Sequence, residues 1–264
     1  MVLNEHLLGE AGQFPGATVL GLIGVVFLII GLKYNNNRTR ATIFGLLAGI
    51  FIWTGWVEFS FVWLAQKLTV APLVENGEVV TKPEYLLMPS SLGLLLTIIL
   101  FFGLSKTNCT FFRWIQKKLD LLGDDQNSDR SKKPLAVITM IEVSVITWLF
   151  YIVLLIVYDN SILGDRHPAT FLVALGSLVW SAWLISKLMV ITKFDYAIRY
   201  AVPTVIIFWN FIEIIGRWGI MDEIWVNPMK YWPHMSITFI AFIGFLFYIL
   251  TAIRTNKFAV PGEN

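Results

Sequence analysis

Seven blocks of apolar residues, each about as long as a bilayer is thick, constrain this chain more than any other feature. A soluble chain in which 56% of residues are hydrophobic and 14% charged cannot hide that much apolar surface in one core. Because lipid offers no partner to backbone N–H and C=O groups, the sequence predicts an all-α integral membrane protein with seven transmembrane helices. We expect a single polytopic domain, 1–264, with spans at about 16–32, 41–65, 86–104, 135–157, 170–191, 201–215 and 235–253.

The orientation follows from the cationic residues between the spans. Of the 20 Lys and Arg residues, 15 fall on the side of the first connection and five on the other. Cytoplasmic loops are enriched in Lys and Arg, so we expect the N-terminus outside and the C-terminus in the cytoplasm, most simply in a bacterial inner membrane. The segment before residue 16 has neither Lys nor Arg and no small-residue cleavage site, so we expect no cleavable signal peptide.

Two connections carry structure of their own. Residues 109–122 alternate apolar and cationic positions at helical spacing, which predicts an interfacial amphipathic helix on the inner leaflet. Outside, Asn76-Gly77 separates two short apolar-rich runs, which predicts a β-hairpin.

One stretch of the second span is echoed in the sixth. Aligning Glu58 with Glu213 also brings Trp63 onto Trp218. Each outward hairpin also returns through a proline followed by hydroxyl residues, which suit the first turn of a helix and the capping of its free amides. These prolines and hydroxyls are Pro89 with Ser90 and Ser91, Pro168 with Thr170, and Pro233 with Ser236. The pattern favours repeated outward hairpins; the alternative is that proline is simply common at helix starts.

Carboxylates inside the spans are the first candidates for function, since a charge in hydrocarbon is costly and must be paired, neutralised or solvated. Glu213 has Arg217 four residues later on the same helix face, which predicts an ion pair. Glu58 has no cation one turn away. It is a proton-carrying group, a neutral acid bonded to a neighbouring helix, or a partner of Arg217. Glu142 pairs with Lys187 in one interpretation; in the other, Lys187 extends to the headgroups.

Aromatic and amide residues beside these acids complete the candidate site. Tryptophans inside spans suit the wall of a hydrophobic or cationic ligand pocket, although most serve as interface anchors and core filler. The predicted ligand- or proton-binding residues are Glu58, Glu213, Arg217, Trp56, Trp209, Asn210, Glu142 and Lys187.

A metal site is the weaker hypothesis. His6, His167 and His234 are all predicted at the outer face, where nearby carboxylates would complete a nitrogen-and-oxygen ligand set. No two of them have the close spacing of a metal motif, and interface histidines without metal are commoner. We therefore expect no cofactor.

Small residues predict where helices touch. Gly45 and Gly49 form a GxxxG pair in the second span, and Ala17 and Gly21 form a similar pair in the first. A third such face belongs to the fifth span: Ala174, Ser177 and Ser181.

Three functions fit these patterns. The favoured one is a small transporter or proton-linked carrier that uses intramembrane carboxylates. The alternatives are a non-catalytic subunit of a larger membrane complex and an intramembrane enzyme acting on a lipid or apolar small molecule. The expected partners are the lipid bilayer and other membrane subunits or further copies of the chain; a net charge of +2 gives no reason to expect nucleic acid.

Overall fold

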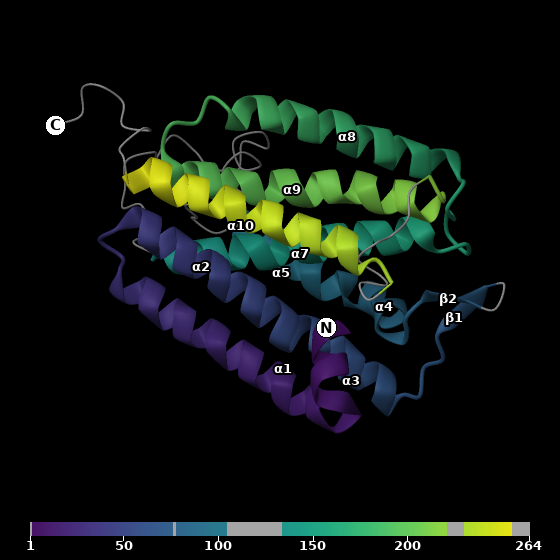
Figure 1. The fold of residues 1–264 in the computed structure, drawn as a ribbon. Helices are drawn as coiled ribbons and strands as arrows, with labels where there is room; N and C mark the ends of the chain where they lie inside the picture. The colour runs from purple at the N-terminus through teal and green to yellow at the C-terminus, as the bar shows by residue number, and fades with distance from the viewer. Residues whose placement is uncertain (1, 76–77, 105–133, 221–229, 255–264) are drawn as a thin grey trace.

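The computed structural model describes residues 2–75, 78–104, 134–220 and 230–254, and in these the chain is almost entirely helical (Figure 1). The helices are α1 (Val2–Lys33), α2 (Arg38–Ile52), the π-helix η1 (Trp53–Glu58), α3 (Phe59–Lys67), α4 (Pro83–Leu87), the 3-10 helix η2 (Met88–Ser91), α5 (Leu92–Leu104), α7 (Leu135–Tyr158), α8 (Pro168–Leu188), α9 (Phe194–Arg217) and α10 (Trp232–Arg254). Two strands, β1 (Leu73–Glu75) and β2 (Glu78–Thr81), pair antiparallel, as predicted.

Several of these helices have the length and composition of membrane spans. In the described part of the chain, six are long and apolar enough to cross a bilayer. They cover Gln13–Lys33, Arg38–Lys67, Pro83–Phe101, Leu135–Tyr158, Pro168–Leu188 and Phe194–Arg217. Many large apolar side chains on them are exposed, as lipid-facing residues are. The helices indicate a membrane-embedded protein.

Two of the predicted starting points differ from the structure. Helix α1 begins at Val2, with Pro15 inside it, instead of near residue 16. Helix α9 begins at Phe194 instead of 201, because the polar residues of its first turns are stabilised by neighbouring helices: Asp195 and Arg199 both form ion pairs across the bundle. The predicted amphipathic helix 109–122 lies outside the described residues.

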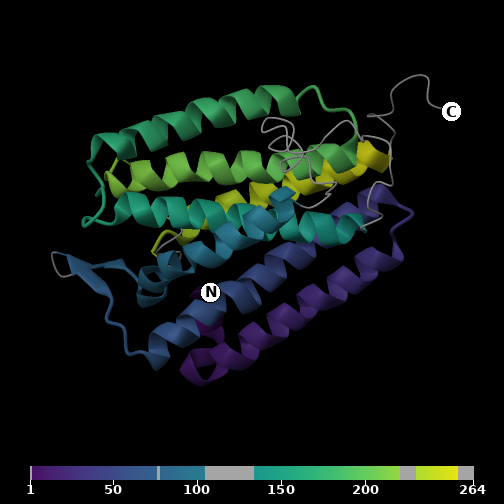
Figure 2. The ribbon, with the colours of Figure 1, turned by 180° about the vertical axis from the view of Figure 1, so that it is seen from behind.

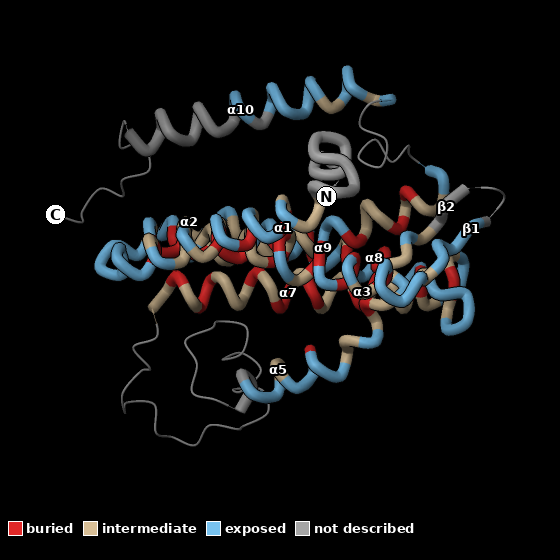
Figure 3. Tube along the Cα trace, turned by 90° about the horizontal axis from the view of Figure 1, so that it is seen from below, coloured by how far each residue is buried: buried red, intermediate tan, exposed pale blue. Residues whose placement is uncertain are grey.

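Five long helices form one layer. Helix α2 packs between α1 and α7, and α9 packs against α7 and α8. Helix α10 lies off one face of this layer and α5 off the other (Figure 3). Seen from behind, α5 lies across α7 (Figure 2), against which it packs. We call the end that carries β1 and β2 the hairpin end, and the end where α1 turns into α2 the far end.

The small residues predicted to bring helices together do so. A Cβ added at Gly45 would lie 2.4 Å from the backbone oxygen of Ala136 in α7, and Gly49 faces Val143 one turn along. On the other side of the same long helix, a Cβ at Gly55 would lie 2.4 Å from the backbone nitrogen of Gly21. The residues Ala174, Ser177 and Ser181 are buried along α8, which packs on α9. Close backbone approach therefore holds the layer together.

Pro168 and Pro233 lie at helix starts and Pro89 at the start of η2, but Ser90, Ser91 and Thr170 donate to carbonyls instead of capping free amides. Ser90 and Ser91 donate to the carbonyls of Leu87 and Met88 three residues back, both at 2.6 Å. At α8, the cap is His167, whose Nδ1 accepts from the Ala169 amide at 3.1 Å. The segments before Ser90 and Ser91 are already helical, so the hydroxyls meet carbonyls instead of free amides.

Candidate functional site

Glu58 closes the π-helical segment that joins α2 to α3. Its residue is 9% exposed, and among the described residues its carboxylate forms no hydrogen bond or ion pair. Segments with π-helical geometry are rare and are frequent at functional sites. An ionised carboxylate in such surroundings costs several kcal/mol, so a proton or a cationic ligand stabilises it.

Two tyrosines connect Glu58 to the other predicted acid. The Tyr85 and Tyr151 rings stack with centroids 6.1 Å apart, and Trp53 stacks on Tyr151 at 6.2 Å. Both Glu58 and Glu213 lie close enough to act electrostatically on both tyrosines. The structure thus brings the two echoed glutamates, from η1 and α9, around one pair of phenol groups.

A pocket of about 320 Å³ lies at the hairpin end, next to Tyr85. It is lined by Gln13, Val62, Ala65, Gln66, Thr69, Val70, Lys82, Pro83, Glu84 and Tyr85. Val62 and Ala65 follow Glu58 at intervals of four and three residues, so they lie on its side of the helix, and Thr69 lies in the turn after α3. Lys82 and Glu84 also act electrostatically on Glu58. Glu58 does not line the pocket, but the lining residues Val62, Lys82, Glu84 and Tyr85 lie near it.

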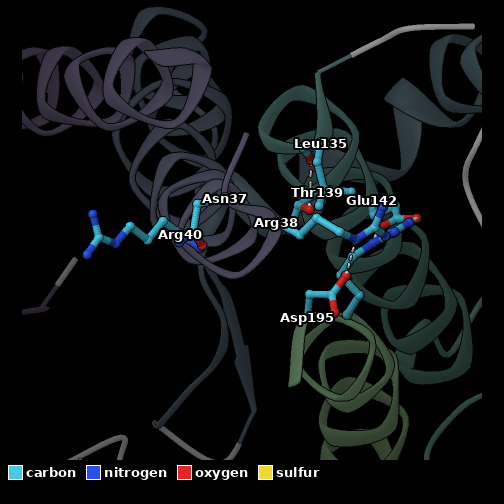
Figure 4. A network of polar contacts seen from close by, with 8 residues as sticks. Asn37, Arg38, Arg40, Leu135, Thr139, Glu142 and Asp195 are labelled. Carbon is cyan, nitrogen blue, oxygen red and sulfur yellow. Dashed lines mark hydrogen bonds and ion pairs between the residues drawn. The ribbon is translucent and has the colours of Figure 1, made fainter. Parts of the chain in front are cut away.

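The far end holds a second group of charges (Figure 4). Arg199 of α9 grips Glu142 of α7 with two hydrogen bonds, one from Nε at 2.8 Å and one from Nη2. Arg38 of α2 donates from Nε to Asp195 of α9 at 2.9 Å. The Arg199–Glu142 pair is buried, with side chains 8% and 12% exposed, whereas Arg38 is 58% exposed. These pairs tie α2, α7 and α9 together.

Arg217 extends across the hairpin end of the bundle. Its Nη2 lies 3.3 Å from Asp165 Oδ1, and its guanidinium carbon is 4.5 Å from the centre of the Tyr158 ring. The next residue, Trp218, donates from Nε1 to the Asp165 carbonyl oxygen at 2.7 Å. Arg217 thus has an ion-pair partner in Asp165 that the sequence did not predict, because the connection between α7 and α8 folds back over the end of α9.

The remaining predicted site residues are spread over the molecule. Glu142 meets Arg199 instead of Lys187, whose ammonium lies 5.8 Å from the centre of the Trp183 ring near the end of α8. Trp56 and Trp209 are exposed on the outer surface, with the Trp56 ring beside Gly21 of α1. Asn210 is buried on α9, and its Nδ2 has no hydrogen-bond partner in the described part of the chain.

The predicted histidine site is not assembled by the residues whose side chains are described. His167 Nδ1 is used in capping α8, and the His234 ring packs edge-on against Tyr231 at 6.2 Å. His6 lies outside the described side chains. Within the described residues, no three His, Cys, Asp or Glu side chains are grouped as metal ligands.

Sequence inspection missed three residues of the site: Glu84, Tyr85 and Tyr151. A signal was present for each. Tyr151 places a hydroxyl deep within the apolar run of α7, and Lys82-Pro83-Glu84-Tyr85 brings two charges and a phenol to the start of the third span.

No protein-family model matches the chain, and comparisons with curated proteins and with solved structures likewise give no match. The function is therefore inferred from the site's own chemistry.

Proposed function

We propose that this chain is a small proton-linked membrane carrier in which Glu58 takes up and releases the proton. The observation that carries the proposal is a buried acid, with no cation bonded to it in the described residues, near residues that line a pocket. Transporter sites commonly lie where a transmembrane helix departs from regular geometry, as the π-helical segment does here. Tyr85 and Tyr151 supply hydroxyls along which a proton moves between Glu58 and Glu213.

The proposal includes seven spans, with α10 as the seventh, and an inner-membrane location with the far end in the cytoplasm. The distribution of cations supports this orientation. The turn from α1 to α2, the first turns of α9 and the last turn of α8 carry Lys33, Arg38, Arg40, Lys187, Lys193 and Arg199. The hairpin end is then the outer face, and the pocket is the outer entrance.

An intramembrane enzyme is less well supported. Glu58, Glu213 and Arg217 would be its acid, base and anion-stabilising group, yet Arg217 is engaged by Asp165 and Tyr158. Arg217 therefore joins the connection between α7 and α8 to α9.

A pH jump applied to the reconstituted protein on a solid-supported membrane tests the carrier. The wild-type chain is expected to give a transient charge displacement, and Glu58→Gln is expected to abolish it, since glutamine cannot take up the proton. Asp159→Asn is the matched control, because it removes an exposed carboxylate at the hairpin end. An unchanged signal in Glu58→Gln would refute the carrier and leave the chain as a non-catalytic subunit.

A further inference from the structure

The pocket at the hairpin end contains a second buried acid. Glu84 lines the pocket and is 9% exposed, yet among the described residues it forms no ion pair or hydrogen bond. Its carboxylate oxygens are not among the fully buried atoms that lack a partner, so they are open to the pocket. A carboxylate in such a position is stabilised by a cation or by hydrogen-bond donors, and the cationic group of a ligand is a suitable partner.

A positively charged residue, Lys82, lines the same pocket. Lys82 comes two residues before Glu84 and is exposed, and no ion pair joins the two side chains. Both lie near Glu58, on which both act electrostatically. The pocket thus holds a buried negative group and a positive group nearer to solvent, and each is available to a ligand.

The rest of the lining suits a small organic molecule. Its polar members are Gln13, Gln66, Thr69 and Tyr85, while the others are apolar. A volume of about 320 Å³ falls at the lower end of the range of ligand pockets, roughly 300–1,000 Å³. Tyr85 presents an aromatic ring, a surface that favours ammonium groups.

We infer that this pocket binds a small zwitterion, with its ammonium group on Glu84 and Tyr85 and its carboxylate on Lys82. The inference rests on the proposed carrier function and names its substrate class: a molecule of amino-acid or betaine type. The ligand's ammonium group compensates the charge of Glu84, and its arrival next to Glu58 favours release of the Glu58 proton. Binding and proton movement are thereby coupled through electrostatics, without direct contact between ligand and Glu58.

Isothermal titration calorimetry on the full-length chain in detergent tests the inference. The zwitterionic probes are glycine, alanine, leucine, phenylalanine and glycine betaine. The singly charged probes are 3-methylbutylamine and 4-methylpentanoate, which keep the leucine skeleton but lose one charge each. At least one zwitterion is expected to bind, and the corresponding singly charged probe at least about tenfold more weakly.

The variants separate the two charges. Glu84→Gln and Lys82→Gln are each expected to weaken zwitterion binding by about tenfold or more, and Asp159→Asn to leave it unchanged. Lys82 is exposed, so its substitution keeps the inference falsifiable even if Glu84→Gln does not fold. The inference is overturned if no zwitterion binds, if the amine alone binds as tightly as leucine, or if both variants bind like the wild type.

Glu58→Gln distinguishes this inference from the carrier proposal. It is expected to bind the zwitterion but to give no charge displacement after a pH jump. Zwitterion binding in a wild-type protein that gives no pH-jump signal would refute the carrier and retain the binding site. A pH-jump signal in a protein that binds no zwitterion would refute the binding site and retain the carrier.

Discussion

At the far end Glu142 and Asp195 each face an arginine, whereas at the hairpin end Glu58 and Glu84 face none within the described residues. Both ends belong to the same helix layer, and all four acids are largely buried. The difference lies in what satisfies them. The two far-end acids bond arginines that join helices, so they are not available to a ligand. At the hairpin end Asp165 is likewise paired, with Arg217, whereas Glu58 and Glu84 have no cation bonded to them in the described part of the chain.

Close helix packing occurs toward both ends: Gly45 meets Ala136 in the far half, and η1 meets α1 in the other half. Near the hairpin end, Gly55 lets η1 approach the backbone of α1, and Phe14 packs edge-on against Phe59 with ring centroids 5.0 Å apart. Packing of this kind needs no polar group. The contact between η1 and α1 therefore forms without an ion pair of Glu58 in the described part of the chain.

The largest expected effect is at the far end. Arg199→Met leaves Glu142 buried without its cation, and we expect unfolding free energy to fall by about 3–5 kcal/mol. Denaturant titration in detergent, followed by tryptophan fluorescence, measures it. Adding Glu142→Leu should recover most of the loss. Arg38→Met is the comparison: Arg38 is mainly exposed, and Asp195 stays stabilised by the free amides of the first turn of α9, so the loss should be smaller, about 1 kcal/mol. Equal losses for the two arginines would contradict the assignment of Arg199 as the buried tie.

The next largest effect on stability is expected at Gly55, where η1 packs closely on α1. In Gly55→Ala the new methyl group meets the Gly21 nitrogen and the Ala17 oxygen, which are backbone atoms and cannot rotate away. We expect a loss of about 1–3 kcal/mol by the same titration. Gly176→Ala is the control, since nothing lies within 4 Å of its Cβ and alanine favours helices by up to about 1 kcal/mol. A Gly55→Ala protein as stable as the Gly176→Ala protein would show that α1 and η1 do not approach this closely.

A smaller effect on stability is expected at Glu58, whose carboxylate joins no helices in the described part of the chain. Glu58→Gln should change the unfolding free energy by less than about 1 kcal/mol, since it breaks no ion pair and glutamine carries no charge to bury. A loss as large as that of Arg199→Met would mean that Glu58 holds the fold, and the contrast between the two ends would disappear.

The smallest effect is at the surface of the hairpin end. The pKa of Asp159 lies below its usual value, because the Ser161 hydroxyl and backbone amide both donate hydrogen bonds to its carboxylate. A lowered pKa in the folded state stabilises the protein above the pKa of the unfolded chain, and this stabilisation is lost as pH falls through the folded value. Melting curves of wild type and Asp159→Asn should therefore differ slightly at neutral pH and converge in acid. A difference that grows in acid would contradict the sign.

Much of the fold follows from the sequence, because lipid imposes simple rules on length and hydrogen bonding. The apolar runs place the helices, Asn76-Gly77 gives the hairpin, and Gly45, Gly49, Ala17 and Gly21 identify the helix contacts. Helix starts are harder to predict. Arg38, Asp195 and Arg199 read as loop residues until partners on other helices are known.

The site was predicted only in part. Glu58 and Glu213 stand out because charge in an apolar run is conspicuous, and the structure brings both near Tyr151. The partner of Glu142 was missed, because the sequence does not show which helices lie side by side: Arg199 of α9 bonds Glu142 where Lys187 was predicted. Arg217 bonds Asp165, a contact that the sequence did not predict. The π-helical geometry has no sequence signature that we recognise, so the shape of the stretch around Glu58 came only from the structure.

Helix α9 is anchored near both of its ends, by Asp195 and Arg199 at one and by Arg217 and Trp218 at the other. Between these anchors Pro203 lies inside the helix, where it removes the hydrogen bond to the carbonyl of residue 199. A bend at Pro203 is therefore a change in the shape of α9 that leaves the contacts at both of its ends intact.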